Sequence, residues 1–137
     1  MNPTPAQLKK LTAVARQAAG RAYAPSSTLP VGAAVLTTTG KIYAGCNVEN
    51  ASYGLTNCAE RTAIFTAVAA GEKNLRLRCV VVYTPTAGAT APCGACRQVI
   101  YEFGPAARVL SCCDSRERID VSIDALLPGA FGPHDLA

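Results

Sequence analysis

The chain has 137 residues, the length of one ordinary domain, and we therefore expect a single domain over residues 1–137. Half of the residues are hydrophobic and 16% are charged, a globular balance that argues against intrinsic disorder. Basic residues outnumber acidic ones, 13 to 9, but they are scattered and aromatic residues are few, which disfavours a nucleic-acid partner. No apolar run approaches the roughly 18 residues that cross a membrane, and the N-terminus lacks a secretory signal, so we expect a cytoplasmic protein without a membrane partner.

The first predicted elements are a helix and a hairpin. Thr4 and Gln7 have the spacing of a capping box, and Pro5 suits the first position of a helix. Strand-like runs at 31–37 and 41–46 flank a Thr-Thr-Gly turn. The N-terminal third of the chain is therefore expected to form one helix followed by a β-hairpin.

Helices and strands alternate in the rest of the chain. The alanine-rich segment 57–70 predicts a buried helix, and the β-branched run at 79–83 predicts a central strand. The remaining elements are expected as a helix at 93–103, strands at 108–112 and 119–121, and a short helix capped by Ser122. This order predicts an α/β sandwich around one mixed sheet.

Three of the seven cysteines have the spacing of metal ligands. Cys93 and Cys96 lie three residues apart, about 60° around a helix, and can share one ion. Alone, that motif would also suit a redox pair or a structural zinc site. Cys58 opens the other central helix, and two helices that start side by side at one sheet edge would bring three thiolates together. Three protein ligands leave the fourth position of a tetrahedral Zn²⁺ open, as in catalytic sites, so we expect one catalytic zinc ion.

Two residues beside Cys58 complete the expected chemistry. Glu60 stands where zinc deaminases carry the glutamate that moves protons and is not a metal ligand. Arg61 lies one turn beyond Cys58 and, with the positive helix N-termini, would offset the charge of three thiolates. The other cysteines (Cys46, Cys79, Cys112 and Cys113) lack ligand spacing and are expected to be inert.

Four segments carry the wider pattern, and three of them lie outside the zinc motifs. They read Val-Gly-Ala-Ala at 31–34, Cys-Asn-Val-Glu-Asn-Ala-Ser-Tyr-Gly at 46–54, Cys-Ala-Glu-Arg-Thr-Ala at 58–63 and Leu-Leu-Pro-Gly-Ala-Phe at 126–131. From about residue 22 onward the chain resembles the small, three-cysteine, homotetrameric cytidine deaminases. The resemblance implies a three-layer α/β/α sandwich around one five-stranded mixed sheet. It also implies zinc-dependent hydrolysis of cytidine and deoxycytidine to uridine and deoxyuridine with release of ammonia, a reaction of pyrimidine salvage.

The resemblance also implies how a nucleoside substrate is bound. Asn47 and Glu49 resemble the pair that hydrogen-bonds the 3′-hydroxyl of the sugar, and the backbone of Ala59 resembles the contact to the pyrimidine ring. Ala51 and Tyr53 resemble groups that reach the 5′ end of the sugar in a neighbouring subunit. The binding sites of a homotetramer would therefore be shared between subunits.

Two other positions, Phe131 and Leu29, bear on the base. Phe131 resembles the aromatic residue that stacks on the base across a subunit boundary. The family pattern Tyr-Ser-x-Phe before Val-Gly-Ala is changed here, since Ser26 replaces the tyrosine and Leu29 replaces the phenylalanine that packs against the base. Leu29 still offers an apolar wall, but an aromatic contact worth about 0.5–1.5 kcal/mol is lost. Substrate preference is the property that this change puts in question.

Three alternatives remain open from the sequence. The altered segment at 26–29 would suit a modified cytosine nucleoside such as blasticidin S. A polynucleotide deaminase would keep the zinc chemistry, but editing enzymes more often carry a histidine in place of Cys58 and need additional elements. A structural zinc module or oligomeric scaffold would need no proton carrier, so Glu60 separates it from an enzyme.

Overall fold

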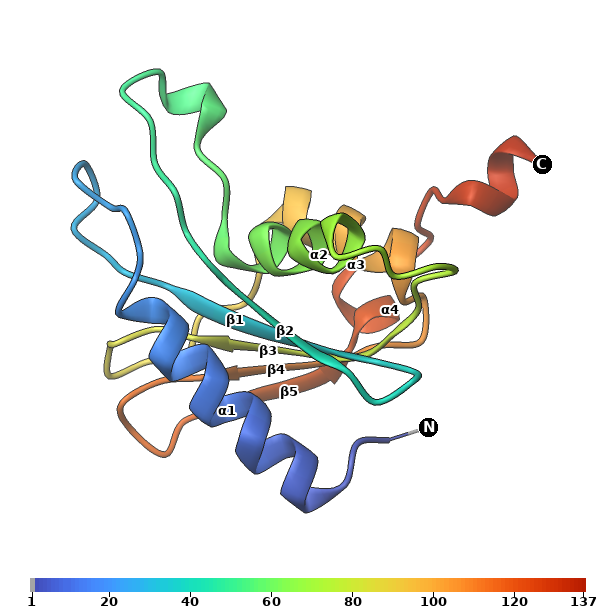
Figure 1. The fold of residues 1–137 in the computed structure, drawn as a ribbon, viewed down its shortest axis with the longest axis horizontal. Coiled ribbons are helices and arrows are strands. Elements are labelled where there is room, and N and C mark those ends of the chain that lie inside the picture. The colour runs from blue at the N-terminus through green and yellow to red at the C-terminus, as the bar shows by residue number, and fades with distance from the viewer. Residues whose placement is uncertain (1) are drawn as a thin grey trace.

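Residues 2–137 are described by a computed structural model, in which one mixed β-sheet lies between two helical layers (Figure 1). The elements in chain order are α1 (Pro5–Ala19), β1 (Gly32–Thr37), β2 (Ile42–Cys46), the 3₁₀ turn η1 (Tyr53–Leu55), α2 (Ala59–Ala69), β3 (Leu77–Tyr83), α3 (Gly94–Phe103), β4 (Arg108–Cys112), β5 (Ile119–Ser122), α4 (Ile123–Leu126) and the 3₁₀ turn η2 (Pro133–Leu136). Among the described residues, no helix is both long and apolar enough to cross a membrane.

The strand order explains where the central helices begin. The five strands lie in the order β2-β1-β3-β4-β5. β1 is antiparallel to both β2 and β3, β4 is parallel to β3, and β5 is antiparallel to β4. Because β2 and β3 run in the same direction, the chain leaves both of them at the same edge of the sheet. The helices that follow, α2 and α3, consequently start at that edge.

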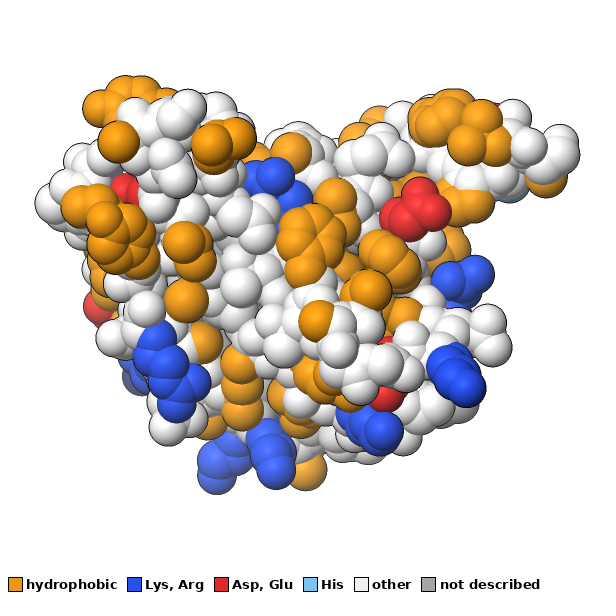
Figure 2. Space-filling model, turned by 45° about the horizontal axis from the view of Figure 1, so that its top comes forward, with side chains coloured by type: hydrophobic (Ala, Val, Ile, Leu, Met, Phe, Trp, Pro, Cys, Tyr) orange, Lys and Arg blue, Asp and Glu red, His pale blue; other side chains and the backbone are white. Residues whose placement is uncertain are grey.

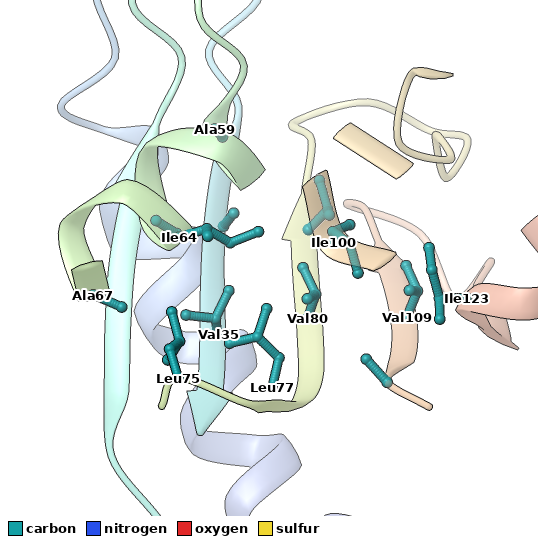
Figure 3. Close-up of a cluster of buried hydrophobic side chains, with 14 residues drawn as sticks. Val35, Ala59, Ile64, Ala67, Leu75, Leu77, Val80, Ile100, Val109 and Ile123 are labelled. Atoms are coloured by element: carbon teal, nitrogen blue, oxygen red, sulfur yellow. The ribbon is translucent and has the colours of Figure 1, made fainter. Parts of the chain in front are cut away.

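Each face of the sheet has its own core. Successive residues of β1 point to opposite faces, with Val35 in the core beneath α2 and α3 and Leu36 in the core beneath α1. Figure 3 shows the first of these clusters, in which Ile64 of α2 lies on the side of Val35 of β1 and Ile100 of α3 lies on the side of Val80 of β3. The expected three-layer α/β/α sandwich around a five-stranded mixed sheet is confirmed.

Two glycines let the helices pack unusually close to the sheet. A Cβ atom on Gly45 would lie 2.2 Å from the backbone nitrogen of Ala63 in α2, and one on Gly32 would lie 1.8 Å from the carbonyl oxygen of Ala15 in α1. Both distances are far below van der Waals contact, so any larger residue would push a helix outward. Gly45 therefore sets the distance between the sheet and α2, the helix that carries Glu60.

Most predicted elements are confirmed, with small shifts at their ends. The capping box of Thr4 and Gln7 is present, and both partners make their hydrogen bonds. The helix expected at 57–70 starts at Ala59 because Cys58 has extended backbone angles and serves as its N-cap. Ser122 stands at the N-cap of α4, but its hydroxyl bonds the side chain of Asp124 and caps no backbone N–H, contrary to expectation.

Two features of the fold were not expected from the sequence. The second helix was expected to be buried, and its inner face is, but Phe65 and Val68 lie on the outer face of α2 and are about half exposed. The 3₁₀ turns η1 and η2 were not predicted either, since each spans three or four residues and lacks a repeating apolar pattern. Both turns lie on segments that project from the body of the molecule (Figure 1).

Candidate active site

The N-termini of α2 and α3 bring three cysteine sulfurs together. Cys58 is the N-cap of α2, Cys93 is the N-cap of α3, and Cys96 lies in the first turn of α3. All three sulfur atoms are within 4.8 Å of one another. The expected cluster is thus formed, and it depends on the shared starting edge of the two helices.

The spacing and chemistry of this cluster fit zinc. Two ligands that each lie about 2.3 Å from a tetrahedral zinc ion are themselves about 3.8 Å apart. The sulfurs of Cys58 and Cys93 are 3.8 Å apart. Thiolates are preferred zinc ligands, and both helix N-termini direct positive partial charge at them. Cys58, Cys93 and Cys96 therefore form a site for one zinc ion.

The Arg61 guanidinium lies against the sulfur cluster. Its Nη2 atom donates a hydrogen bond of 3.3 Å to the sulfur of Cys58, and its Nε atom is buried without a partner among the described residues. A hydrogen bond from the Cys96 thiol, followed by the contact with Arg61, lowers the pKa of Cys58. The site thus favours a thiolate at Cys58 even before a metal binds.

Glu60 is buried beside the sulfurs. Its side chain is 4% exposed, and it lines the same cavity as Cys58 and Cys93. Burial is the main cause that raises the pKa of Glu60 to about 7, and the nearby negative charge of Cys58 contributes to this rise. A carboxyl group with a pKa near neutrality can both accept and release protons under ordinary conditions.

The cavity in front of the sulfurs has the size and lining of a small-molecule site. Its volume is about 260 Å³, close to the lower end of the range of roughly 300–1,000 Å³ for ligand pockets. The accessible lining is mostly apolar, with several polar side chains among the lining residues. The lining residues are Ser27, Leu29, Val31, Asn47, Glu49, Thr56, Cys58, Ala59, Glu60, Val82, Thr84, Thr90, Ala91 and Cys93.

Asn47 and Glu49 lie at the cavity and are already engaged within the chain. The Asn47 amide accepts a hydrogen bond from the backbone of Val31 and donates one to the carbonyl of Leu29. The Glu49 carboxylate accepts two backbone N–H groups, from Ser26 and Ser27, and the Ser27 hydroxyl. The Ser27 hydroxyl is the largest contribution that lowers the pKa of Glu49, so this carboxylate is ionised.

The other predicted contact residues divide into two groups. Ala59 and Leu29 line the cavity. Ala51, Tyr53 and Phe131 do not line it within one chain, and the side chain of Tyr53 is 76% exposed. Tyr53 and Phe131 belong to the two projecting segments. Figure 2 shows hydrophobic side chains gathered on both projections, with a depression between them.

Some cavity residues were not assigned a role from the sequence. Thr84, Thr90 and Ala91 come from the connection between β3 and α3, which ends at Pro92 and the ligand Cys93. Their position directly before a metal-ligand motif was the available signal. Ser27 was noted only as part of an altered segment, although its hydroxyl contacts Glu49.

The remaining candidates have structural surroundings. Arg97 donates hydrogen bonds to the carbonyls of Pro92 and Leu126, and so braces the start of α3. His134 is exposed and lies beside Asp135, away from the sulfur cluster. Cys79 is buried and its pKa is raised by burial to about 12, as suits an inert thiol.

Comparison with known proteins gives a consistent result. Residues 5–112 match the family described as the cytidine and deoxycytidylate deaminase zinc-binding region. The chain is 45% identical to the cytidine deaminase of Sporosarcina psychrophila over 131 residues, 95% of each chain. It is 44% identical to that of Halalkalibacterium halodurans, covering 88% of this chain and 90% of the relative. The crystal structure of cytidine deaminase from Burkholderia pseudomallei superposes with a TM-score of 0.85 at 48% identity, covering 90% of this chain and 98% of that one.

Proposed function

The chain belongs to the cytidine and deoxycytidylate deaminase family, and we propose that it hydrolyses cytidine and deoxycytidine to uridine and deoxyuridine with release of ammonia. The observation that carries this proposal is the position of the buried Glu60 carboxyl beside three zinc-binding sulfurs in one nucleoside-sized cavity. A purely structural zinc site would have four protein ligands and no need for such a carboxyl group. Only three candidate ligands lie together in residues 2–137.

Glu60 is the proton carrier of the proposed reaction. Zinc, when bound, supplies a Lewis acid that makes water acidic enough to attack near neutral pH. The Glu60 carboxylate accepts a proton from the attacking water and delivers it to N3 of the base. It then transfers the second proton of that water to the amino group, which leaves C4 as ammonia. Water and cytidine are thereby converted to uridine and ammonia, and the carboxylate is restored.

Asn47 and Glu49 have hydrogen-bonding capacity left for a sugar hydroxyl. After its two internal hydrogen bonds, the Asn47 amide retains one N–H donor. Glu49 Oε2 accepts only the Ser27 hydroxyl and keeps a free lone pair. One hydroxyl can accept from the first and donate to the second. We assign this pair to the 3′-hydroxyl of the nucleoside on that basis.

Exposed apolar side chains support a homotetramer with shared sites. Phe65 and Val68 on α2, Leu55 in η1, and Phe131 in the C-terminal segment are each at least 46% exposed in the single chain. Large exposed hydrophobic side chains in clusters mark surfaces that other proteins cover. In such an assembly Ala51, Tyr53 and Phe131 of one subunit complete the cavity of another.

The proposed setting is pyrimidine salvage in the cytoplasm. The substrate is a free nucleoside, since a cavity of about 260 Å³ has room for one base and one sugar. All seven cysteines are free thiols, as a reducing compartment requires and as zinc binding at three of them needs. We propose that the protein acts without a polynucleotide or membrane partner.

Turnover of cytidine by the zinc-loaded protein is the direct test. We expect a decrease in absorbance at the cytosine band, with uridine and ammonia formed in equal amounts. Deoxycytidine is assayed in parallel because the assigned sugar contact does not involve the 2′ position. A zinc-replete protein, oligomeric or not, that converts neither nucleoside would refute the proposal.

A further inference from the structure

The turn that carries Leu29 holds a strained residue. Thr28 has a φ angle of +57°, in the left-handed region. For a β-branched residue this conformation is a true outlier, and it persists only where the surroundings enforce it. Thr28 lies between Ser27 and Leu29, which both line the cavity. The strain is therefore located at the rim of the proposed nucleoside site.

The Glu49 carboxylate enforces this turn. Its Oε1 atom accepts the backbone N–H groups of Ser26, at 2.9 Å, and Ser27, at 3.1 Å. Glu49 as a residue is 8% exposed, and its hydrogen bonds to the turn are partly buried. Two N–H groups fixed on one side of the turn leave Thr28 little freedom to relax.

The Ser27 hydroxyl connects the carboxylate to Leu29. Ser27 Oγ donates to Glu49 Oε2 and accepts the backbone N–H of Leu29 at 3.1 Å. Glu49 Oε2 is the same atom that keeps a free lone pair for the sugar hydroxyl. The Ser27 hydroxyl thus connects Glu49, which we assign to the sugar, with Leu29, which we place beside the base.

We propose that Ser27 is a positioning residue that couples recognition of the sugar hydroxyl to the placement of Leu29 against the base. The inference rests on the proposed function, since it concerns how the same cavity selects its nucleoside. Without the Ser27 hydroxyl, Glu49 turns more freely and the strained turn relaxes. The hydrogen bond to the sugar hydroxyl and the packing of Leu29 against the base are then weakened together. Glu60 and the three sulfurs keep their positions.

The test compares Ser27→Ala with the matched control Ser26→Ala. Ser26 contacts Glu49 through its backbone alone, and its side chain makes no hydrogen bond within residues 2–137. For Ser27→Ala we expect kcat/KM for cytidine to fall about ten- to a hundredfold, the size of a hydrogen bond to a charged group. The loss should lie in KM, with kcat within about twofold of wild type. Ser26→Ala should behave as wild type.

Two further readouts separate positioning from general damage. The preference for cytidine over 2′,3′-dideoxycytidine should shrink in Ser27→Ala, because Glu49 no longer holds its orientation. Adding Thr28→Gly to Ser27→Ala should lower the raised KM part of the way towards the wild-type value, because glycine adopts the left-handed conformation without strain. Should Ser27→Ala not fold, Ser27→Thr and Ser27→Val make the same comparison, since they have the same shape and differ in the hydroxyl.

The possible results are distinguishable. An inactive wild-type protein would refute the proposed function itself. An active wild type with equal effects of Ser27→Ala and Ser26→Ala would overturn only the role of Ser27. So would a loss confined to kcat, an unchanged preference against the dideoxynucleoside, or a double variant no better than Ser27→Ala.

Discussion

The Glu60 side chain combines deep burial with a pKa near 7, and it shares its cavity with two of the three sulfurs. Glu60→Gln keeps the shape of the side chain and removes its ability to carry protons. We expect the variant to bind zinc normally and to lose about 10²- to 10⁴-fold in kcat, the usual contribution of a positioned acid–base group. Metal content and cytidine turnover measured on one preparation check this. A variant that retains most of its activity would show that another group moves the protons.

Leu29 stands at the cavity wall where the family pattern has a phenylalanine. Leu29→Phe should restore an aromatic contact with the base, worth about 0.5–1.5 kcal/mol, and lower KM for cytidine about two- to tenfold. Turnover of cytidine and of a bulkier modified nucleoside such as blasticidin S is compared in both proteins. If the preference between the two substrates does not move, Leu29 does not set the substrate range.

Among individual residues, the sequence was most informative about the metal ligands. The spacing of Cys58, Cys93 and Cys96 predicted the cluster because the ligand chemistry is local to two helix starts. The role of Ser27 could not be predicted, because its partner Glu49 is 22 residues away and only the folded chain brings them together. The internal hydrogen bonds of Asn47 were unpredictable for the same reason.

The position of α2 depends on close contact with β2 at Gly45. Gly45→Ala would place a methyl group 2.2 Å from the Ala63 nitrogen, so α2 must move outward. We expect a loss of about 1–3 kcal/mol in the free energy of unfolding, together with weaker zinc binding as Cys58 moves away from Cys93. Urea unfolding and competition with a chelator measure the two effects.

Gly54→Ala is the matched control for this substitution. A Cβ atom on Gly54 meets no atom within 4 Å, and its φ angle is not in the left-handed region. It should therefore leave both the unfolding free energy and the zinc affinity unchanged. Equal stability of the Gly45 and Gly54 variants would show that α2 is not held by this close approach.

At the level of elements, repeating patterns predicted well and isolated turns did not. Strand runs, the Thr4 capping box and the stop at Gly104 each have a local chemical cause that can be recognised in the sequence. The outer face of α2 was misjudged because Phe65 and Val68 look like core residues. Hydrophobicity alone does not distinguish a side chain buried within its own chain from one that a neighbouring subunit covers.

The proposed assembly makes a prediction about mixed molecules. If each cavity takes Glu60 from one subunit and Phe131 from another, Glu60→Gln and Phe131→Ala subunits damage different parts of the same site. Each variant alone should be weakly active at low cytidine concentration. Oligomers formed from equal amounts of both should regain activity, because about a quarter of their cavities would combine two intact parts.

Co-expressed and separately purified variants provide the comparison. Activity of the mixed oligomers equal to the mean of the two pure variants would show that the sites are not shared. Light scattering of the wild-type protein gives the number of subunits independently, and a monomer with full activity would contradict the shared site directly.

We infer that three sulfurs hold one zinc ion and leave its fourth position open to solvent. X-ray absorption at the zinc edge of the purified protein measures the ligands directly. We expect three sulfur atoms at about 2.3 Å and one lighter oxygen ligand. Four sulfur ligands, or a protein that neither contains zinc nor takes it up, would contradict it.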